Sequence, residues 1–340
     1  MKAVVYDAPR KYVVADVPLV QAGPGEVRIK VLQVGMCGTD VHIHSGDFGA
    51  VFPLTPGHEL VGTVDALGEG VDRFALDEQV SVNPNVYCGT CDYCLSGRLI
   101  LCANMRGYGS NFPGFFAEYV TVRQDLVFSV HGIDPDTAVF TEPAACAMHG
   151  LESLAMRPGA TALVFGAGPT GLLLAQLIKS GGAASVTVAA PTQFKLDTAA
   201  ALGLDQTVLI DRSDMEANRR TLLEASGTDG YDYVVEATGS TDVGGICVPL
   251  TRGGGTVLVY GVTRAEETVS FRPYDVFRRE ITIKGSFAEM TSFGAAIRAL
   301  RAGRARTDGI ITHRFSLDDY DKALDAVAHD RGVHKVVLVP

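Results

Sequence analysis

Two short stretches bring together residue types that bind zinc. Cys37 offers a thiolate, and His58 and Glu59, further along the chain, offer an imidazole and a carboxylate. Zn²⁺ accepts all three ligand types, and three protein ligands with one open position are typical of a catalytic zinc site. Thr39 and His42 add a hydroxyl and a second imidazole close to Cys37. These stretches predict a zinc ion that can bind a substrate hydroxyl.

A second group of zinc-binding residue types follows in one short segment, as Cys88, Cys91, Cys94 and Cys102. Four thiolates so close together can complete a tetrahedral zinc site that leaves no position for a substrate. An iron–sulfur cluster is another centre that four cysteines can hold. We expect zinc, in a structural role.

Glu142 is a further carboxylate candidate for the first zinc site. The residues on either side of it, at 138–140 and 144–145, are apolar, so an ionised glutamate there would need a cation. Cys146 and His149 follow shortly, and we interpret both as packed side chains rather than ligands. The sequence leaves open whether Glu59 or Glu142 completes the site.

A glycine motif indicates a nucleotide site. Residues 160–165 form an apolar run that is typical of a strand buried on both faces, and residues 172–179 form an apolar helix. Glycines in the segment between this strand and this helix allow a tight turn and bring the backbone close to a pyrophosphate at the helix N-terminus. The turn between strand and helix is formed by the motif Gly166, Gly168, Pro169, Thr170 and Gly171.

The residues after the next strand bear on the choice of cofactor. NAD-binding sheets usually carry an acid there, on the ribose 2′-hydroxyl. This chain has Ala190 at that position, with Thr192 and Lys195 close behind and no acid between 189 and 195. Because a carboxylate would repel a 2′-phosphate, its absence and the nearby cation favour NADP over NAD. The alternative is that Lys195 is a solvated helix residue and that the protein accepts both cofactors.

Composition excludes several classes of partner. The 340 residues carry a net charge of −10, which disfavours nucleic acids and anionic membrane surfaces. No apolar run is long enough to span a membrane, and the N-terminus has no signal-peptide pattern. The seven cysteines, clustered and odd in number, indicate metal binding in a reducing compartment, so we expect a cytoplasmic protein.

The elements that position these residues fall into two kinds. Residues 1–34 and 53–82 have strand character, with alternating apolar and charged residues at 26–31 and glycine turns between the strands. Residues 155–286 alternate strands with helices and can hold the two halves of a doubly wound parallel sheet. A helix over 292–301, a helix opened by a capping box over Ser316–Asp319 and a strand over 334–339 follow.

Taken together, the motifs resemble those of the zinc-containing medium-chain alcohol and polyol dehydrogenases, over essentially the whole chain. They are Pro24–Val27, Cys37–Asp40, Gly57–Glu59, the four-cysteine lobe, Glu142-Pro143, Gly166–Gly171, Glu236–Gly239 and Lys284–Ser286. The resemblance implies an α/β protein with a GroES-like catalytic domain over 1–150 and 287–340, including a zinc lobe at 88–102. It also implies a Rossmann domain over 151–286, a cleft at the junction, and a homodimer or homotetramer.

The resemblance also assigns roles to single residues. Cys37 and His58 would bind the catalytic zinc, and Glu59 and Glu142 would be direct, water-mediated or exchanging ligands. Asp40 would lie behind these ligands, while Thr39 and His42 would carry the alcohol proton. Two zinc ions per subunit are implied, and Thr238 and Gly261 would join the glycine motif at the cofactor.

A glutamate at 142 resembles the branch that oxidises sorbitol, threonine and other polyol-like substrates. We therefore expect reversible oxidation of a secondary hydroxyl of a polyol to a ketose with NAD(P)⁺. Ala288-Glu289 stands where animal sorbitol dehydrogenases carry Arg-Tyr, which argues against sorbitol itself. An L-threonine 3-dehydrogenase is the main alternative. A non-enzymatic NADP(H) sensor has no need of the zinc-binding residues, and a zinc-ribbon nucleic-acid binder conflicts with the acidic charge.

Overall fold

A computed structural model of the chain describes residues 1–47 and 49–340. It divides into two compact units, of which unit 1 comprises Met1–Ala145, Glu289–Arg301 and Gly309–Pro340. Unit 2 comprises Cys146–Ala288 and Ala302–Asp308. None of the helices in the described ranges combines the length and the apolar character needed to cross a membrane.

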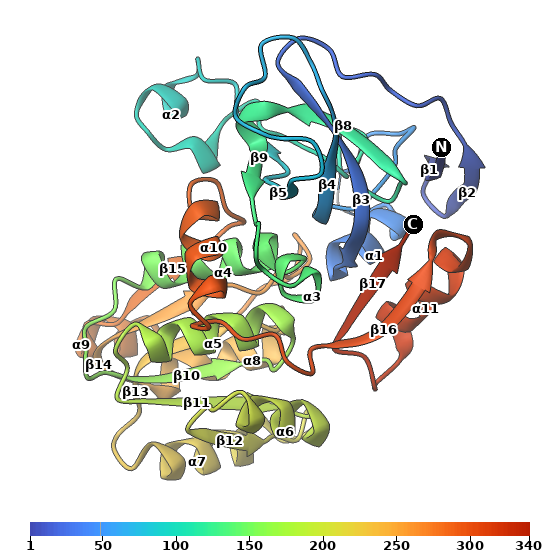
Figure 1. Ribbon diagram of the computed structural model, residues 1–340. Coiled ribbons are helices and arrows are strands. Elements are labelled where there is room, and N and C mark those ends of the chain that lie inside the picture. Colours follow the sequence, from blue (N-terminus) through green and yellow to red (C-terminus); the bar gives the residue numbers. More distant parts are fainter. Residues whose placement is uncertain (48) are drawn as a thin grey trace. The chain divides into compact units, whose positions relative to one another are not determined.

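Unit 1 is rich in strands. Its main sheet has the order β16-β17-β3-β4-β5-β9, with β8 paired to β3 (Figure 1). Two small sheets pair β1 with β2 and β6 with β7. The strands are β1 (Lys2–Ala8), β2 (Lys11–Asp16), β3 (Glu26–Met36), β4 (Glu59–Leu67), β5 (Gln79–Val82), β6 (Asn85–Val86), β7 (Arg106–Gly107), β8 (Tyr119–Arg123), β9 (Val127–Ser129), β16 (Ile311–Ser316) and β17 (Lys335–Val339).

Short helices complete unit 1. They are α1 (Gly38–Ser45), α2 (Asp92–Leu95), η1 (Leu99–Leu101), η2 (Gln124–Leu126), α3 (Pro135–Ala138), the start of α4 (Thr141–Leu154), α10 (Phe293–Arg301), η3 (Leu317–Asp319) and α11 (Tyr320–His329). The expected capping box at Ser316 is wrong in detail, because Ser316 Oγ donates to Asp319 Oδ2 at 3.0 Å instead of capping a backbone N–H. The first turn is a 3₁₀ turn, and the α-helix begins only at Tyr320.

The core of unit 1 lies on one face of its main sheet. The alternating residues Val27, Ile29 and Val31 of β3 are buried there with Leu60 and Val64 of β4. Arg28 and Lys30 lie between them on the other face, and Arg28 Nε donates to Asp65 Oδ2 at 2.5 Å. The alternation of buried and exposed side chains that the sequence predicts for residues 26–31 is therefore present in β3.

Unit 2 is a parallel six-stranded sheet with the order β12-β11-β10-β13-β14-β15. In chain order this is 3-2-1-4-5-6, the order of a dinucleotide-binding Rossmann sheet, so the doubly wound expectation is confirmed. The strands are β10 (Thr161–Phe165), β11 (Ser185–Ala190), β12 (Gln206–Leu209), β13 (Tyr231–Glu236), β14 (Thr251–Val259) and β15 (Thr282–Gly285). The helices are α5 (Pro169–Ser180), α6 (Gln193–Ala201), α7 (Met215–Ser226), α8 (Thr241–Leu250) and α9 (Pro273–Arg279).

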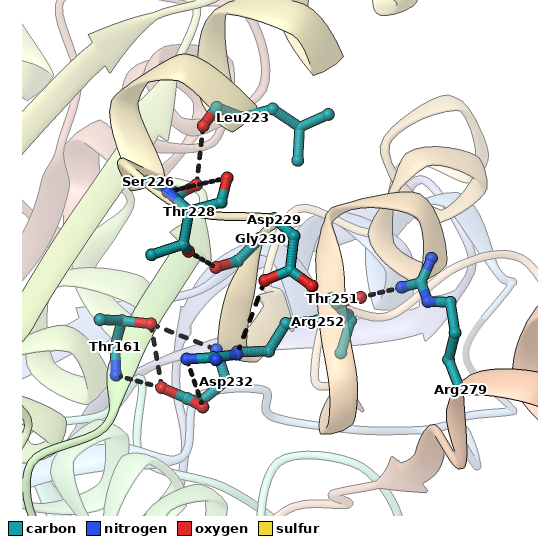
Figure 2. A network of polar contacts seen from close by, with 10 residues as sticks. All are labelled: Thr161, Leu223, Ser226, Thr228, Asp229, Gly230, Asp232, Thr251, Arg252 and Arg279. Carbon is teal, nitrogen blue, oxygen red and sulfur yellow. Dashed lines mark hydrogen bonds and ion pairs between the residues drawn. The ribbon is translucent and has the colours of Figure 1, made fainter.

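Polar contacts tie together the amino ends of the central strands of unit 2. Thr161, at the start of β10, donates from its backbone N and its Oγ1 to Asp232 Oδ2 at 2.8 and 3.1 Å (Figure 2). Arg252 of β14 lies 3.5 Å from Asp232 Oδ1 and 3.8 Å from Asp229 Oδ1. This network lies at the end of the sheet opposite the glycine motif, where it links the starts of β10, β13 and β14.

The units differ from the expected domain boundaries in three places. Residues 146–150 and 287–288, expected in the catalytic domain, belong to unit 2. The sequence places all of 287–340 in the catalytic domain, whereas Ala302–Asp308 clusters with unit 2. The reason is a pair of hydrogen bonds from α5, since Gln176 Nε2 donates to the Arg306 carbonyl at 3.0 Å and Gln176 Oε1 accepts from the Arg306 N at 2.8 Å.

Candidate functional site

The pairing of β3 with β4 brings three metal-ligand types together in unit 1. Cys37 follows the last residue of β3, and His58 precedes the first residue of β4. The strands are antiparallel, with Gly35 opposite Glu59, so the end of one lies beside the start of the other. One potential ligand atom from each of Cys37, His58 and Glu59 lies within 4.8 Å of the others. Two ligands of a tetrahedral zinc lie about 3.3–3.8 Å apart, so small side-chain movements would complete this set.

The turn into α1 holds Cys37 in place. The Cys37 backbone N donates to Asp40 Oδ2 at 2.8 Å, and the Asp40 N donates to the Cys37 carbonyl at 3.0 Å. The first turn of α1 is therefore closed around the cysteine. Thr39 Oγ1 lies 3.7 Å from Cys37 Sγ, which puts the hydroxyl beside the thiol.

Asp40 also faces the candidate ligand His58. Asp40 Oδ1 lies 3.7 Å from His58 Nδ1, and the Asp40 side chain is fully buried. Burial acts to lower the pKa of His58, but the charge of Asp40 and the hydrogen bond with Cys37 outweigh it and raise that pKa. Burial raises the pKa of Asp40. The carboxylate behind the imidazole orients the ring, as is usual for histidines that bind metals.

Glu59 is paired with a lysine that lies far away in the sequence. Glu59 is 1% exposed and Lys335 is 4% exposed, and Glu59 Oε2 forms an ion pair with Lys335 Nζ. β3 lies between their strands, with Gly35 opposite both Glu59 and Val337. A Cβ added at Gly35 would lie 2.0 Å from Glu59 Oε2 and 2.8 Å from Lys335 Cε. The glycine therefore provides the space in which the pair meets.

More acidic than basic side chains are buried around these residues. Glu142 and Glu289 are also buried, and the charge of Glu142 acts on His58, Lys335 and Glu289. Asp40 Oδ1 and Glu289 Oε2 are buried without a hydrogen-bond partner in the described residues. Even without Glu289, the buried carboxyls of Asp40, Glu59 and Glu142 outnumber the basic groups His58 and Lys335, and buried carboxylates in excess require a cation. The donor set of thiol, imidazole and carboxylate fits zinc.

Glu289 is held by a neighbouring amide. Asn85 Nδ2 donates to the Glu289 carbonyl at 2.9 Å and to Glu289 Oε1 at 3.2 Å. Burial, followed by the charge of Glu142, raises the pKa of Glu289 to about 8. A carboxyl with that pKa is mostly protonated at neutral pH and can donate a hydrogen bond.

His42 lies apart from the group of three ligands. Its Nδ1 lies 3.1 Å from Asp47 Oδ1, and its side chain is 42% exposed. Within the described part of the chain, Thr39 and His42 share no direct hydrogen bond. A proton path from Thr39 to His42 therefore needs water between them.

The four-cysteine lobe forms a compact set of sulfurs. The Sγ atoms of Cys91 and Cys94 are 3.5 Å apart, and the pairs Cys88–Cys94 and Cys91–Cys102 are each 4.0 Å apart. A tetrahedron of zinc–sulfur bonds requires separations of about 3.8 Å, so the lobe fits zinc. Hydrogen bonds from the backbone and side chain of Thr90 and from the Cys91 N lower the pKa of Cys88 to about 5, which favours the thiolate.

In unit 2 the glycine motif forms the turn between β10 and α5. Gly166 has a φ of 108°, and its N donates to the Ala189 carbonyl at 2.9 Å. Gly168 is the N-cap of α5, with Pro169 and Thr170 in its first turn. A Cβ at Gly171 would lie 2.2 Å from the Gly166 carbonyl oxygen. The helix N-terminus thus begins directly at the carboxyl end of β10, as a pyrophosphate site requires.

Glu236, at the end of β13, organises the neighbouring loops. Its carboxylate accepts from the Thr238 N at 2.7 Å and from Thr238 Oγ1, while its carbonyl accepts from the Gly261 N at 2.7 Å. A Cβ at Gly261 would lie 2.3 Å from the Gly239 N. Thr238 and Gly261 are therefore placed at the same carboxyl edge of the sheet as the glycine motif.

The remaining predicted cofactor residues follow β11. Ala190 ends the strand and is buried, Thr192 is the N-cap of α6, and Lys195 lies in the first turn of that helix. Their positions match those expected from the sequence, at the carboxyl end of the strand next to β10.

Sequence reasoning missed two buried groups near the zinc candidates, Lys335 and Glu289. The signal for Lys335 was present, because it is a single charge in an otherwise apolar strand. Glu289 stands out in the sequence only as a departure from a motif, and no local pattern indicates what it approaches.

Comparisons with known proteins cover both units. Residues 23–132 match the family model of the alcohol dehydrogenase GroES-like domain, and residues 169–302 match that of zinc-binding dehydrogenases.

Relatives match over nearly the full length. D-arabinitol dehydrogenase 1 of Uromyces fabae is 39% identical over 343 residues, which cover 100% of this chain and 97% of the relative. D-altritol 5-dehydrogenase of Agrobacterium fabrum is 34% identical over 324 residues, covering 94% of each. A solved structure described as a zinc-binding dehydrogenase of Sinorhizobium meliloti 1021, bound to NADP, is similar with a TM-score of 0.93 at 32% identity, covering 100% of this chain and 99% of that one.

Proposed function

Because the chain belongs to the zinc-binding, GroES-like alcohol and polyol dehydrogenases, we propose that it oxidises a secondary hydroxyl of a polyol to a ketone, reversibly and with NADP. The observation that carries the proposal is the convergence of Cys37, His58 and Glu59 from two paired strands. The relatives named for arabinitol and altritol support a polyol as the substrate.

The residues have separate tasks in this reaction. Bound zinc supplies a Lewis acid that lowers the pKa of a substrate hydroxyl, and bound nicotinamide supplies the acceptor for a hydride. Cys37, His58 and Glu59 hold the metal, with Asp40 orienting His58 and Lys335 balancing the charge of Glu59. Glu142 is the alternative carboxylate ligand. Thr39 accepts the hydroxyl proton and releases its own toward water near the exposed His42.

The glycine motif and the loops around Glu236 hold the dinucleotide in unit 2. We assign its pyrophosphate to the turn Gly166–Gly171. The missing acid at Ala190, with Lys195 close by, supports NADP as the preferred form. The four cysteines of the lobe bind a second zinc, which makes two per subunit.

The test combines substrates, cofactors and metal content. Initial rates are measured for arabinitol, altritol, xylitol and sorbitol, each with NADP⁺ and NAD⁺, with threonine and ethanol as controls. We expect polyol turnover with NADP⁺ preferred, and two zinc ions per subunit. His58→Ala should reduce turnover at least about 10³-fold and remove one zinc, because a ligand of the Lewis acid is lost. Turnover of threonine alone, or an active His58→Ala protein, would refute the proposal.

We also propose that the chain self-associates through the β15 edge of unit 2. β15 has a neighbour on one side only within the described sheet. Large apolar side chains are exposed on α9, the helix that precedes it in the chain, with Phe277 at 77% and Tyr274 at 68%. An unpaired strand next to an exposed apolar patch favours association with another chain, and a second copy fits the expected homodimer or homotetramer.

A further inference from the structure

Two basic side chains lie close together at the carboxyl edge of the unit 2 sheet. Lys195 belongs to the first turn of α6, after β11, and Arg212 follows β12. The two strands are neighbours, with Ala190 paired to Leu209 and the Ile210 N donating to the Ala190 carbonyl at 3.1 Å. The pairing brings the segments after both strands to the same place.

Neither cation has an acidic partner in the part of the chain that the structure describes. Within residues 1–47 and 49–340, Lys195 and Arg212 form no ion pair. Arg219 and Arg220, on the following helix, are in contrast both paired with Glu216. Burial first, and the charge of Arg212 second, lower the pKa of Lys195. Two like charges held together without a counter-charge repel each other, and an anion bound between them would remove that cost.

The acid next to Arg212 in the chain, Asp211, is already engaged. Asp211 Oδ1 accepts from the Ser213 N at 2.8 Å and from Ser213 Oγ at 2.7 Å, which turns its carboxylate toward its own loop. The Thr192 side chain, at the N-cap of α6, makes no capping hydrogen bond. Thr192, Lys195 and Arg212 thus bring a hydroxyl, an ammonium and a guanidinium to the segments that follow β11 and β12.

We propose that Arg212 and Lys195 together bind the 2′-phosphate of NADP, beside the small side chain of Ala190. Arg212 is an additional specificity-determining residue, and this assignment rests on the proposed use of NADP. A guanidinium can donate two parallel hydrogen bonds to a phosphate, which makes Arg212 the more selective of the two groups.

The direct test is binding of two small ligands that differ by the phosphate in question. Calorimetry on the zinc-replete protein compares adenosine 2′,5′-bisphosphate with adenosine 5′-monophosphate. We expect the bisphosphate to bind more tightly. Arg212→Ala should weaken bisphosphate binding about 10- to 100-fold, the loss typical of a charged hydrogen-bonding pair, and leave monophosphate binding unchanged. Arg212→Lys should weaken bisphosphate binding less than Arg212→Ala does. Lys195→Ala should weaken binding of the bisphosphate and leave binding of the monophosphate unchanged.

Arg220→Ala is the matched control, because it removes an exposed arginine from the next helix that is already paired with Glu216. It should change binding of neither ligand. Steady-state kinetics give a second readout, in which Arg212→Ala raises the KM for NADP⁺ and leaves kcat and the KM for NAD⁺ unchanged.

Three outcomes would overturn the assignment. They are equal binding of both ligands by the unmodified protein, an equal loss of both in Arg212→Ala, and a loss as large in Arg220→Ala. Because this assay needs neither polyol nor turnover, a failure of the polyol reaction alone would count only against the proposed function.

Discussion

At the scale of single residues, the candidate zinc site depends on how its buried charges are balanced. Asp40, Glu59 and Glu142 are buried in one unit, and the buried Lys335 pairs with Glu59 and interacts with the charges of the other two. Glu59 would be costly in this position without both a metal and a lysine. Lys335 is thus as much part of the site as the candidate ligands, although it need not touch the metal.

The Glu59–Lys335 pair leads to a prediction about stability. Lys335→Met should lower the free energy of unfolding by about 3–5 kcal/mol, because it leaves a buried carboxylate without its partner. Lys322→Met is the matched control, since Lys322 pairs with Asp319 at the surface and is 66% exposed. That change should cost about 1 kcal/mol or less.

Chemical unfolding of both variants gives the comparison. Adding Glu59→Gln to Lys335→Met should recover part of the lost stability, because the unpaired charge is removed. If Lys335→Met and Lys322→Met lowered the free energy of unfolding equally, the buried pair would contribute no more to stability than the surface pair.

At the scale of elements, the lobe and the glycine turn are local structures. The lobe needs only a few turns, formed by α2 and η1, to bring its four sulfurs together. The Sγ atoms of Cys91–Cys94, Cys88–Cys94 and Cys91–Cys102 lie 3.5–4.0 Å apart. The glycine turn needs only a strand, a helix and small residues where the backbones approach. Spacing in the sequence is sufficient to predict both, because their residues are neighbours in the chain.

The lobe gives a prediction about metal removal. Cys91→Ala should lower the zinc content from two to one per subunit and lower the unfolding midpoint, because a structural zinc contributes free energy of folding. Cys247→Ala is the control, as it removes a buried thiol in unit 2 that is outside both metal groups. Metal analysis and thermal unfolding would be done together. An unchanged midpoint in Cys91→Ala would mean that the lobe does not depend on a metal.

At the scale of the whole molecule, the edges of the unit 2 sheet differ. The β12 edge carries Leu209, which is 56% exposed, whereas the β15 edge lies next to a larger group of exposed apolar residues. That group comprises Tyr274 and Phe277 on α9, Ile283 on β15 and Phe287 just after β15. A patch of this kind is more often an interface than free surface.

The last prediction concerns assembly. Phe277→Asp should shift the protein toward smaller species, because it places a charge in the proposed interface. Leu209→Asp, which makes the same kind of change at the opposite edge, should leave the mass unchanged. Light scattering after size-exclusion chromatography measures both. A monomeric unmodified protein, or equal shifts in the two variants, would contradict the proposed edge.

The sequence by itself determined the local parts of this protein. It predicted the doubly wound sheet, the strand–turn–helix at Gly166–Gly171 and the compact group of four cysteines. It also predicted the buried alternation of residues 26–31. In each case the period or spacing that carries the information lies within one element or one turn, where the covalent chain limits the arrangement.

Only the tertiary structure decided which distant residues meet. Lys335 reaches Glu59 because β17 and β4 both pair with β3, and because Gly35 leaves space between them. Arg212 approaches Lys195 because β11 and β12 pair in one register. The segment 302–308 joins unit 2 through Gln176. These contacts follow from the order and register of strands, which depend on packing of the whole core and leave no periodic signal at the residues themselves.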